Sequence, residues 1–238
     1  MKIALIGYGK MGKTIEALGI KQGNSFPLII DENNSGDLNS EKLRGINVAI
    51  EFTAPAAAPG NIASCLKLGV PVVTGTTGWN AQLTEIENLC NEAEGTLFHA
   101  SNFSIGVNIL FAMNRHLARI MDSFPEYKVS MEEVHHIHKL DAPSGTAITL
   151  AEQILDESSG LNKWTLKGDG ENGELPIEAI REGEVKGRHT ILYHSEVDTI
   201  SLTHDALSRD AFAAGALLAA EFVLGKRGVF GMHDLLKL

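Results

Sequence analysis

Cysteine is scarce in this chain of 238 residues, which contains only Cys65 and Cys90. They lie far apart and neither belongs to a paired spacing, which argues against a disulfide framework and against a zinc knuckle. Long apolar runs are missing too, since none approaches the roughly 18 residues needed to span a bilayer. Gly7 also interrupts the first apolar run too early for a secretory signal. We therefore expect a cytoplasmic protein with no membrane segment.

Basic residues are fewer than acidic residues in this chain. Lysine and arginine total 20 against 30 aspartates and glutamates, which gives a formal charge of -10. This balance disfavours a nucleic-acid groove or an anionic membrane as a partner. An anionic ligand must therefore find a local positive site. The length allows one large domain or two small ones, each with a buried core.

Short apolar runs alternate with helical stretches over the first hundred residues. Four of the five runs are nearly continuous apolar segments, which is typical of parallel strands covered on both faces. The alternation predicts an α/β fold with a Rossmann doubly wound parallel sheet. The expected strands are 2–7, 26–31, 46–53, 70–75 and 95–100, and the expected helices are 11–22, 56–68 and 80–93.

The pattern changes near residue 105 and predicts a second, α+β domain with a mixed or antiparallel sheet. The terminal helix is rich in small apolar residues and is expected to return to the first domain. We expect a dinucleotide-binding domain of residues 1–104 with 214–238 and a substrate-binding and oligomerisation domain of residues 105–213. In the second part we expect helices at 105–124 and 145–158, strands at 127–138, 177–183, 189–196 and 198–206, a polar glycine-rich loop at 168–174, and a closing helix at 212–225.

The segment "LIGYGKMG" places Gly7, Gly9 and Gly12 in G-x-G-x-x-G spacing between an expected strand and an expected helix. Such glycines allow a tight turn, close approach of a pyrophosphate and close packing of the helix on the strand. A plain structural turn is the alternative. Asp31 ends the second expected strand, where an acid that binds ribose belongs. The context favours a dinucleotide site.

Glu32 and Asn33 follow Asp31, and no arginine is present there to receive a 2′-phosphate. A carboxylate at this position binds a 2′-hydroxyl and repels a phosphate. We therefore expect NADH to be preferred, with NADPH possible through Lys10 or Lys13. Two later loops, 74–79 and 100–106, follow expected strands and are expected to face a nicotinamide; two ordinary turns are the alternative.

Residues 132–147 read "EEVHHIHKLDAPSGTA" and concentrate titratable side chains. If 127–138 is a strand, His135 and Lys139 share one face while His136 and His138 share the other. A histidine and a lysine on one face suit proton donation beside an anionic group. The amides after Pro143 are expected to open a helix and to bind an anion there.

Two alternatives remain for these histidines. His136 and His138 could hold one zinc ion, but no third ligand stands at a telling spacing, so we expect no metal. The histidines could also belong to a sheet surface or a subunit contact. Asp141 is expected to hold the turn.

The segment matches the pattern E-x-H-x-x-x-K-x-D-x-P-S-G-T-A, and the chain resembles the 4-hydroxy-tetrahydrodipicolinate reductase family. Further blocks of the chain look like those of the family in the same order, among them "EFTAP", "GTTGW", "ASNFSIGVN" and "IREGEVKGRHT". The resemblance implies NAD(P)H-dependent reduction of a small cyclic dicarboxylate in diaminopimelate and lysine biosynthesis, with hydride added to C4 and a proton to C3. It also implies a homotetramer.

The resemblance implies roles for individual residues. His135 resembles the proton donor, and Lys139 a second proton donor or a charge stabiliser. Substrate binding is expected of His136, Ser144, Gly145 and Thr146. Cofactor binding is expected of Gly7, Tyr8, Gly9, Lys10, Met11, Gly12, Asp31, Gly75, Thr76, Thr77, Ala100, Ser101, Asn102 and Phe103. Another small Rossmann dehydrogenase, acting on an amino acid or a sugar, and an inert NAD-sensing or zinc-binding protein are the competing hypotheses.

Overall fold

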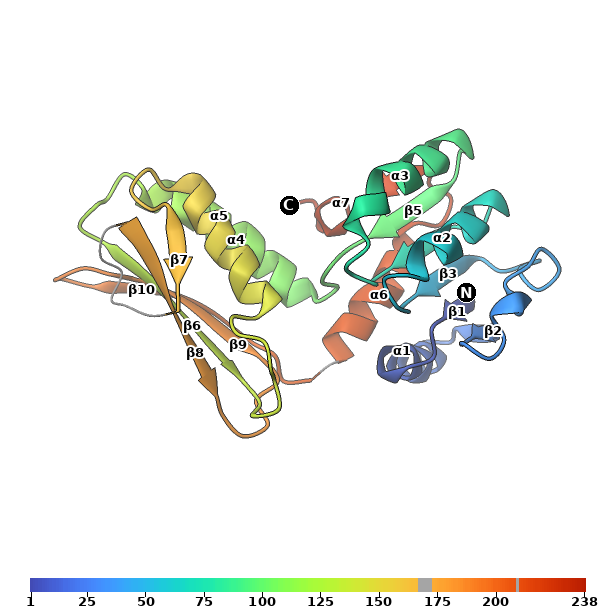
Figure 1. The fold of residues 1–238 in the computed structure, drawn as a ribbon, viewed down its shortest axis with the longest axis horizontal. Coiled ribbons are helices and arrows are strands. Elements are labelled where there is room, and N and C mark those ends of the chain that lie inside the picture. The colour runs from blue at the N-terminus through green and yellow to red at the C-terminus, as the bar shows by residue number, and fades with distance from the viewer. Residues whose placement is uncertain (167–172, 209) are drawn as a thin grey trace. The chain divides into compact units, whose positions relative to one another are not determined.

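The computed structural model describes residues 1–166, 173–208 and 210–238. The chain divides into two compact units, one of Met1–Ile105 with Asp210–Leu238 and one of Gly106–Arg209. Figure 1 shows both units as ribbons. The functional domain limits expected from the sequence, 1–104 with 214–238 and 105–213, differ from these bounds by a few residues and stay a prediction.

The first unit contains a six-stranded sheet in the order β11-β5-β4-β3-β1-β2. Every neighbouring pair in it is parallel. The chain runs outward from β1 to β2 and then back through β3, β4 and β5, so β1 and β3 flank the point where the strand order reverses. Its strands are β1 (Lys2–Ile6), β2 (Ser25–Ile30), β3 (Val48–Glu51), β4 (Val72–Thr74), β5 (Thr96–His99) and β11 (Gly228–Phe230).

Helices cover both faces of this sheet. Helices α2 (Ala58–Lys67) and α3 (Leu83–Glu92) pack on one face through a core that includes Ile62 and Cys90. On the other face lie α1 (Lys10–Lys21), α6 (Asp210–Phe222) and α7 (Met232–Leu236). Because both faces are apolar, the strands read as continuous hydrophobic runs. The predicted doubly wound parallel sheet is confirmed.

Helix α6 is built from small residues because it lies against backbone. A Cβ placed on Gly215 would lie 1.8 Å from the carbonyl oxygen of Phe103. Ala213, Ala216 and Ala220 are fully buried along the same helix. These residues bring α6 directly over the segment that follows β5, so this late segment completes the first unit.

The second unit contains a five-stranded sheet in the order β10-β9-β6-β8-β7. The β6, β8 and β7 pairs are parallel, whereas β9 pairs antiparallel with both β6 and β10, so the predicted mixed sheet is confirmed. The strands are β6 (Lys128–His135), β7 (Lys163–Thr165), β8 (Glu174–Arg181), β9 (Arg188–His194) and β10 (Thr199–Asp205). Of the polar loop predicted at 168–174, residues 168–172 lie outside the described residues.

Helices α4 (Ile105–Met121) and α5 (Gly145–Glu157) lie together on one side of this sheet (Figure 1). Leu110 and Ile154 are among the buried residues that join them to Met131 and Ile191 of the strands. The end of β6 and the beginning of α5 therefore lie close together. Between them runs the histidine-lysine segment.

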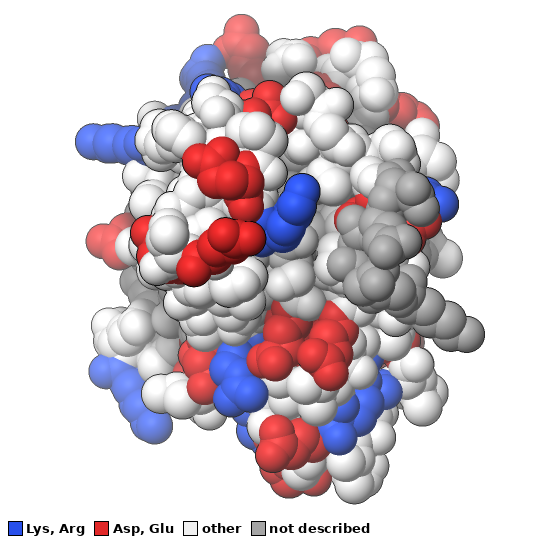
Figure 2. Space-filling view, turned by 90° about the vertical axis from the view of Figure 1, so that its left-hand side faces the viewer, with Lys and Arg blue, Asp and Glu red and all other residues white. Residues whose placement is uncertain are grey.

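No described helix combines the length and the apolar character required to cross a membrane. On the face drawn in Figure 2, acidic and basic side chains alternate and no continuous basic surface forms. The expectation that nucleic acid is not a partner stays a prediction.

Candidate active site

The glycine loop after β1 has the geometry that a dinucleotide requires. Gly7 has a φ of +97°, and a Cβ there would lie 2.0 Å from the carbonyl oxygen of Phe52. A Cβ on Gly12 would lie 2.2 Å from the carbonyl oxygen of Gly7. At Gly9, by contrast, the added atom meets nothing within 4 Å, which leaves open space at the N-cap of α1. Gly7 and Gly12 therefore serve packing, while Gly9 leaves room for a phosphate.

The loops after β1, β3, β4 and β5 meet around Phe52. A Cβ on Gly75 would lie 2.1 Å from the Phe52 ring, and the rings of Phe52 and Phe103 are 5.6 Å apart between centroids. Phe103 is 1% exposed, so it can offer a cofactor only its backbone. The structure thus brings the glycine loop together with the predicted cofactor residues that follow β4 and β5, which are Gly75, Thr76, Thr77, Ala100, Ser101, Asn102 and Phe103.

Asp31 is the first residue after β2 and is exposed. Its Oδ1 accepts a hydrogen bond of 2.7 Å from the amide of Asn33, and its own amide donates to Asn34 at 2.7 Å. These bonds fix the carboxylate at the carboxyl edge of the sheet. Its second oxygen remains available for a ribose hydroxyl.

In the second unit, a buried carboxylate lies two residues before the end of β6. Glu133 is 0% exposed; its Oε2 accepts the Ser144 amide at 3.0 Å and its Oε1 accepts Nη2 of Arg181 at 3.1 Å. Burial alone would raise the pKa of Glu133, but the hydrogen bonds from Ser144 and Arg181 and the charge of His135 lower it overall. Glu133 is therefore a fixed anion beneath the site.

His135 is the last residue of β6 and is 8% exposed. Its Nδ1 lies 3.5 Å from Oε2 of Glu133, and its ring meets that of His189 edge-on at 5.1 Å between centroids. Burial lowers the pKa of His135, the charges of Lys139 and Arg181 add to this, and Glu133 opposes it. The imidazole is therefore neutral near pH 7 in the substrate-free protein. Because Nδ1 faces the carboxylate, we assign the tautomer with the proton on Nδ1, so Nε2 is the atom free to exchange a proton.

Ser144 is the N-cap of α5. Its Oγ accepts the amide of Ala147 at 3.2 Å and lies 3.0 Å from Nε2 of His189, while its amide bonds to Glu133. Ser144 is also buried and holds the site together, and Pro143 lies before the cap instead of inside the first turn. Substrate binding by Ser144 stays a prediction. The amides of Gly145 and Thr146 belong to the first turn, where a helix offers no internal acceptor. These two residues remain the predicted anion contacts.

Lys139 lies in the turn after β6, where its amide donates to the carbonyl of His136 at 3.1 Å. Its Nζ donates to both carboxylate oxygens of Asp141 at 2.8 Å each. The bonds from Lys139 lower the pKa of Asp141. A substrate carboxylate must therefore compete with Asp141 for this ammonium group.

Arg181 connects these parts and was not predicted. Besides Glu133, its guanidinium bonds to the carbonyl oxygens of Asp141 at 2.6 Å and of Lys139 at 3.3 Å. It is the last residue of β8, next to His135 in the parallel pairing of β6 and β8. Arg181 thus fixes the turn that carries Lys139 to the end of the strand that carries His135.

The predicted strand over 127–138 is wrong at its end. Strand β6 stops at His135, whose carbonyl accepts the amide of Glu182 at 2.8 Å, and beyond it the amide of Ile137 still donates to the carbonyl of Gly183 at 3.2 Å. The alternation that placed His136 and His138 on one opposite face therefore does not apply. His136 enters a turn, and His138 is exposed with its Nε2 3.5 Å from Glu184.

A metal is possible by distance alone at Glu133, His135 and His189, whose ligand atoms all lie within 4.8 Å of one another. The carboxylate oxygens already accept hydrogen bonds from Ser144 and Arg181, and Nε2 of His189 already bonds to Ser144. An ion would have to displace these bonds. The absence of a metal stays a prediction.

His189 supplies a prediction for stability. It is 4% exposed, and burial, with the charge of His135 adding to it, lowers its pKa from 6.5 to about 4. Between pH 6.5 and about pH 4, His189 is therefore protonated in the unfolded chain and neutral in the folded chain. The free energy of unfolding consequently falls as the pH falls through this window. The loss amounts to about 3 kcal/mol. In urea titrations from pH 7 to pH 4, we expect His189→Gln to lose this much less than the wild type, and exposed His138→Gln to lose as much as the wild type. Equal slopes in all three proteins would contradict the assignment.

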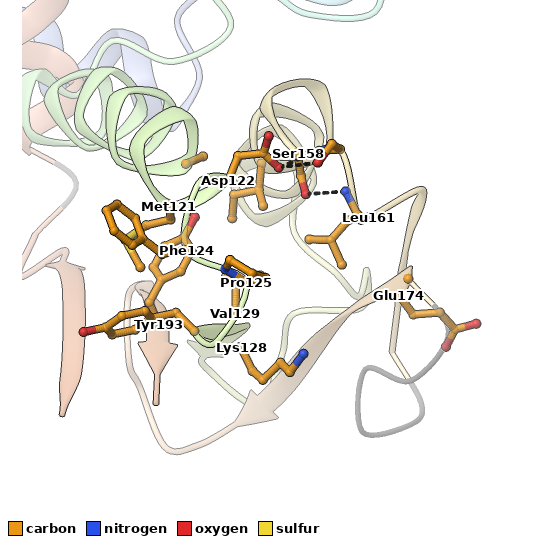
Figure 3. A pocket seen from close by; sticks show the side chains of 16 residues that line it. Met121, Asp122, Phe124, Pro125, Lys128, Val129, Ser158, Leu161, Glu174 and Tyr193 are labelled. Carbon is orange, nitrogen blue, oxygen red and sulfur yellow. Dashed lines mark hydrogen bonds between the residues drawn. The ribbon is translucent and has the colours of Figure 1, made fainter. Parts of the chain in front are cut away.

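A cavity of about 680 Å³ in the same unit lies away from this site (Figure 3). Figure 3 shows Lys128, Val129 and Tyr193 among the side chains that line it. Lys128 begins β6 and His135 ends it. At the rise of an extended strand, the two residues lie roughly 20 Å apart. The predicted catalytic residue His135 therefore lies outside this cavity.

Family models match both parts of the chain. The model described as "Dihydrodipicolinate reductase, N-terminus" matches residues 1–103, and "Dihydrodipicolinate reductase, C-terminus" matches residues 106–236. The chain belongs to the dihydrodipicolinate reductase family. The family and the oxidoreductase class predicted from the sequence are thereby confirmed.

Relatives within the dihydrodipicolinate reductase family cover most of the chain. A 4-hydroxy-tetrahydrodipicolinate reductase of Christiangramia forsetii is 45% identical over 237 residues, 99% of this chain and 98% of that protein. One from Methanopyrus kandleri is 41% identical over 197 residues, 80% of this chain and 71% of that protein. Among solved structures, the dipicolinate-bound dihydrodipicolinate reductase of Paenisporosarcina sp. TG-14 superposes with a TM-score of 0.79, at 25% identity, with 98% of each chain covered.

Sequence reasoning missed several residues of the site. Glu133 stood inside the quoted family pattern without a role, and Arg181 and His189 stood inside the block "IREGEVKGRHT". Gly187 has a φ of +151°, and a Cβ there would lie 3.1 Å from Nε2 of His135. Spacing could not have found Arg181 and His189, since they lie on β8 and β9 and meet His135 only through the sheet pairing. Glu133 lies on β6 two residues before His135, so the alternation of a strand could have placed it on the same face.

Proposed function

We propose that this chain reduces 4-hydroxy-tetrahydrodipicolinate to tetrahydrodipicolinate with NAD(P)H, in diaminopimelate and lysine biosynthesis. Loss of the 4-hydroxyl as water leaves a conjugated cyclic imine, which takes hydride at C4 and a proton at C3. One observation supports the proposal most strongly: the buried imidazole of His135, with Nε2 free, occurs together with the Lys139 ammonium group and the N-terminus of α5. The family models for this reductase match nearly the whole chain.

The cofactor is a nicotinamide dinucleotide, which supplies hydride when bound. The first unit suits it by two observations: open space at Gly9 beside the first amides of α1, and a fixed carboxylate at Asp31. Tyr8, Lys10 and Met11 belong to the same loop and are proposed as further contacts. Gly75 and Thr76 bring backbone and a hydroxyl to the same edge of the sheet.

In the second unit, Lys139 and the amides of Gly145 and Thr146 are proposed to bind the two carboxylates of the substrate. Binding of a dianion raises the pKa of His135, because a negative charge nearby favours the imidazolium form. Nε2 of His135 is then proposed to give its proton to C3 as hydride reaches C4. Glu133 stabilises the imidazolium from the opposite side at Nδ1. His136, at the start of the turn, is proposed as a further substrate contact.

A coupled assay tests the function directly. The upstream synthase generates the unstable substrate, and the absorbance of the reduced cofactor is followed at neutral pH. We expect cofactor oxidation that depends on both the synthase product and this protein. Oxidation with amino acids or sugars instead would favour a different small dehydrogenase.

We predict that NADH is preferred over NADPH. The Asp31 carboxylate is exposed and fixed by Asn33, and Glu32 beside it is also exposed, so a 2′-phosphate would meet two negative charges. We expect kcat/KM to be higher with NADH than with NADPH. The ratio of the two kcat/KM values should be smaller in Asp31→Asn, which keeps the shape of the side chain without its charge. A clear preference of the wild type for NADPH would overturn this reading of Asp31.

A homotetramer and a cytoplasmic location are proposed on the family resemblance alone. Light scattering on the purified protein tests the first.

A further inference from the structure

Glu51 is a buried acid that the proposed mechanism has not used. It is the last residue of β3 and is 0% exposed. Its Oε1 accepts the amide of Thr53 and the hydroxyl of Thr76 at 3.1 Å each, and also the hydroxyl of Thr53. Its Oε2 accepts the hydroxyl of Thr74 at 2.5 Å. Four donors from three threonines thus surround one carboxylate.

The partners of the Glu51 carboxylate are groups that can donate hydrogen bonds to it. The Thr53 amide can only donate, and the Thr76 hydroxyl already accepts that amide at 2.8 Å, so its proton is left for Glu51. Within residues 1–166, 173–208 and 210–238, no lysine, arginine or histidine forms an ion pair with Glu51. The Glu51 carboxylate is therefore held out of water by hydrogen bonds, without a cationic partner among these residues.

This charge lies under the loops assigned to the cofactor. Strand β3 is the neighbour of β1, at the reversal of strand order where open α/β sheets bind ligands. A Cβ on Gly7 would lie 2.0 Å from the carbonyl oxygen of Phe52 and 3.0 Å from Cγ2 of Thr53, the two residues that follow Glu51. Thr76, which donates to Glu51, begins the loop after β4 that is proposed to face the nicotinamide.

We propose that Glu51 tunes the cofactor electrostatically: its fixed carboxylate favours the oxidised, positively charged nicotinamide over the reduced, neutral one. The inference rests on the proposed function. When hydride leaves C4 of the dihydropyridine ring with both bonding electrons, the ring becomes a cation, while the substrate accepts the electron pair and takes a proton at C3. A buried anion lowers the free energy of the cation, and its preorganised donors need no rearrangement as the charge forms.

The competing explanation is that Glu51 only holds the loops after β3 and β4 in place. That role would weaken binding of both cofactor forms to the same extent when Glu51 is changed. The electrostatic role changes their ratio. The decisive quantity is therefore Kd for the oxidised cofactor divided by Kd for the reduced cofactor, measured without dicarboxylate substrate.

The test compares Glu51→Gln with the wild type by titration of NAD⁺ and NADH separately, with calorimetry for both. The amide oxygen can still accept the Thr53 amide, and the amide nitrogen can donate to Thr74, whose hydroxyl rotates. We expect the Kd ratio to rise about tenfold, the effect of one charge roughly 12 Å away at an effective dielectric constant of about 20. Thr74→Val removes a donor and keeps the charge, so its ratio should match the wild type.

An unchanged ratio in Glu51→Gln, or an equal change in Thr74→Val, overturns the proposal. Should Glu51→Gln fail to fold, the double variant Glu51→Met with Thr74→Val removes the charge together with a donor, and the same tenfold rise is expected. The test is separate from the proposed function, because a wild type that binds both cofactor forms but does not reduce the dicarboxylate would still report the ratio.

Discussion

The His135→Gln variant is expected to lose about 10²-fold or more in kcat, the usual range for removing a general acid. Glutamine keeps a polar group of similar length at the end of β6 but cannot deliver a proton. Binding of NADH should stay as in the wild type, because His135 belongs to the second unit and the proposed cofactor residues belong to the first. The coupled assay gives kcat, and a fluorescence titration gives the cofactor affinity.

His138→Gln is the matched control, since it makes the same substitution three residues away. The His138 side chain is 70% exposed and faces Glu184. We expect its kcat to stay within about twofold of the wild type, as for most surface substitutions. Near-wild-type turnover in His135→Gln, or an equal loss in both variants, would remove His135 from the mechanism.

The pH profile separates proton donation from a purely structural role. In the free protein the pKa of His135 is lowered, first by burial and then by Lys139 and Arg181, so kcat/KM should fall as the pH rises through a value below 6.5. In the substrate complex two carboxylates oppose those cations, so kcat should hold to a higher pH before it falls. His135→Gln should lose both inflections. If kcat and kcat/KM of the wild type fall at the same pH, the bound dianion does not raise the pKa of His135.

The layout of the first unit could be predicted because its signals are local. Apolar runs, the glycine spacing and the position of Asp31 are all read within a few residues, and β1 to β5 appear where the runs predicted them. Strands β7 and β11 were not predicted. Each has three residues, too few to show a period, and β11 exists because Thr96–Phe98 of β5 offers it a parallel partner.

The catalytic site was only half predicted, for a geometric reason. His135 and Lys139 stand close together in the sequence, whereas Glu133, Arg181 and His189 meet across β6, β8 and β9. Alternation could not place His136 and His138, because nothing in the local sequence says that β6 ends at His135; their rings still lie 6.1 Å apart between centroids, beyond the strand. The end is set by neighbouring strands: Arg181 closes β8 beside His135, and the chain then leaves the sheet.

Lys139→Ala is expected to lower kcat/KM by about 10²-fold or more, through a higher KM and a lower kcat together. Removing one partner of a hydrogen-bonded charge pair costs several kcal/mol when the other partner stays out of water. Here the partner left behind is a carboxylate of the substrate, and the loss continues into turnover because the electron pair that moves toward C3 loses the same cation. Lys163→Ala, which breaks the salt bridge between Lys163 of β7 and Glu174 of β8, is the matched control and should keep wild-type kinetics.

Dipicolinate, to which the dihydrodipicolinate reductase of Paenisporosarcina sp. TG-14 is bound, is the dicarboxylate probe that we would titrate to test the proposed role of Lys139 without reaction. Its Kd should rise in Lys139→Ala and should depend less on salt than in the wild type, because one protein charge no longer takes part. Asp141 decides how large this effect is, since it holds Nζ of Lys139 at 2.8 Å before any ligand arrives. Asp141→Asn should therefore tighten dipicolinate binding, whereas weaker binding would mean that Asp141 is needed to hold Lys139 in place for the substrate.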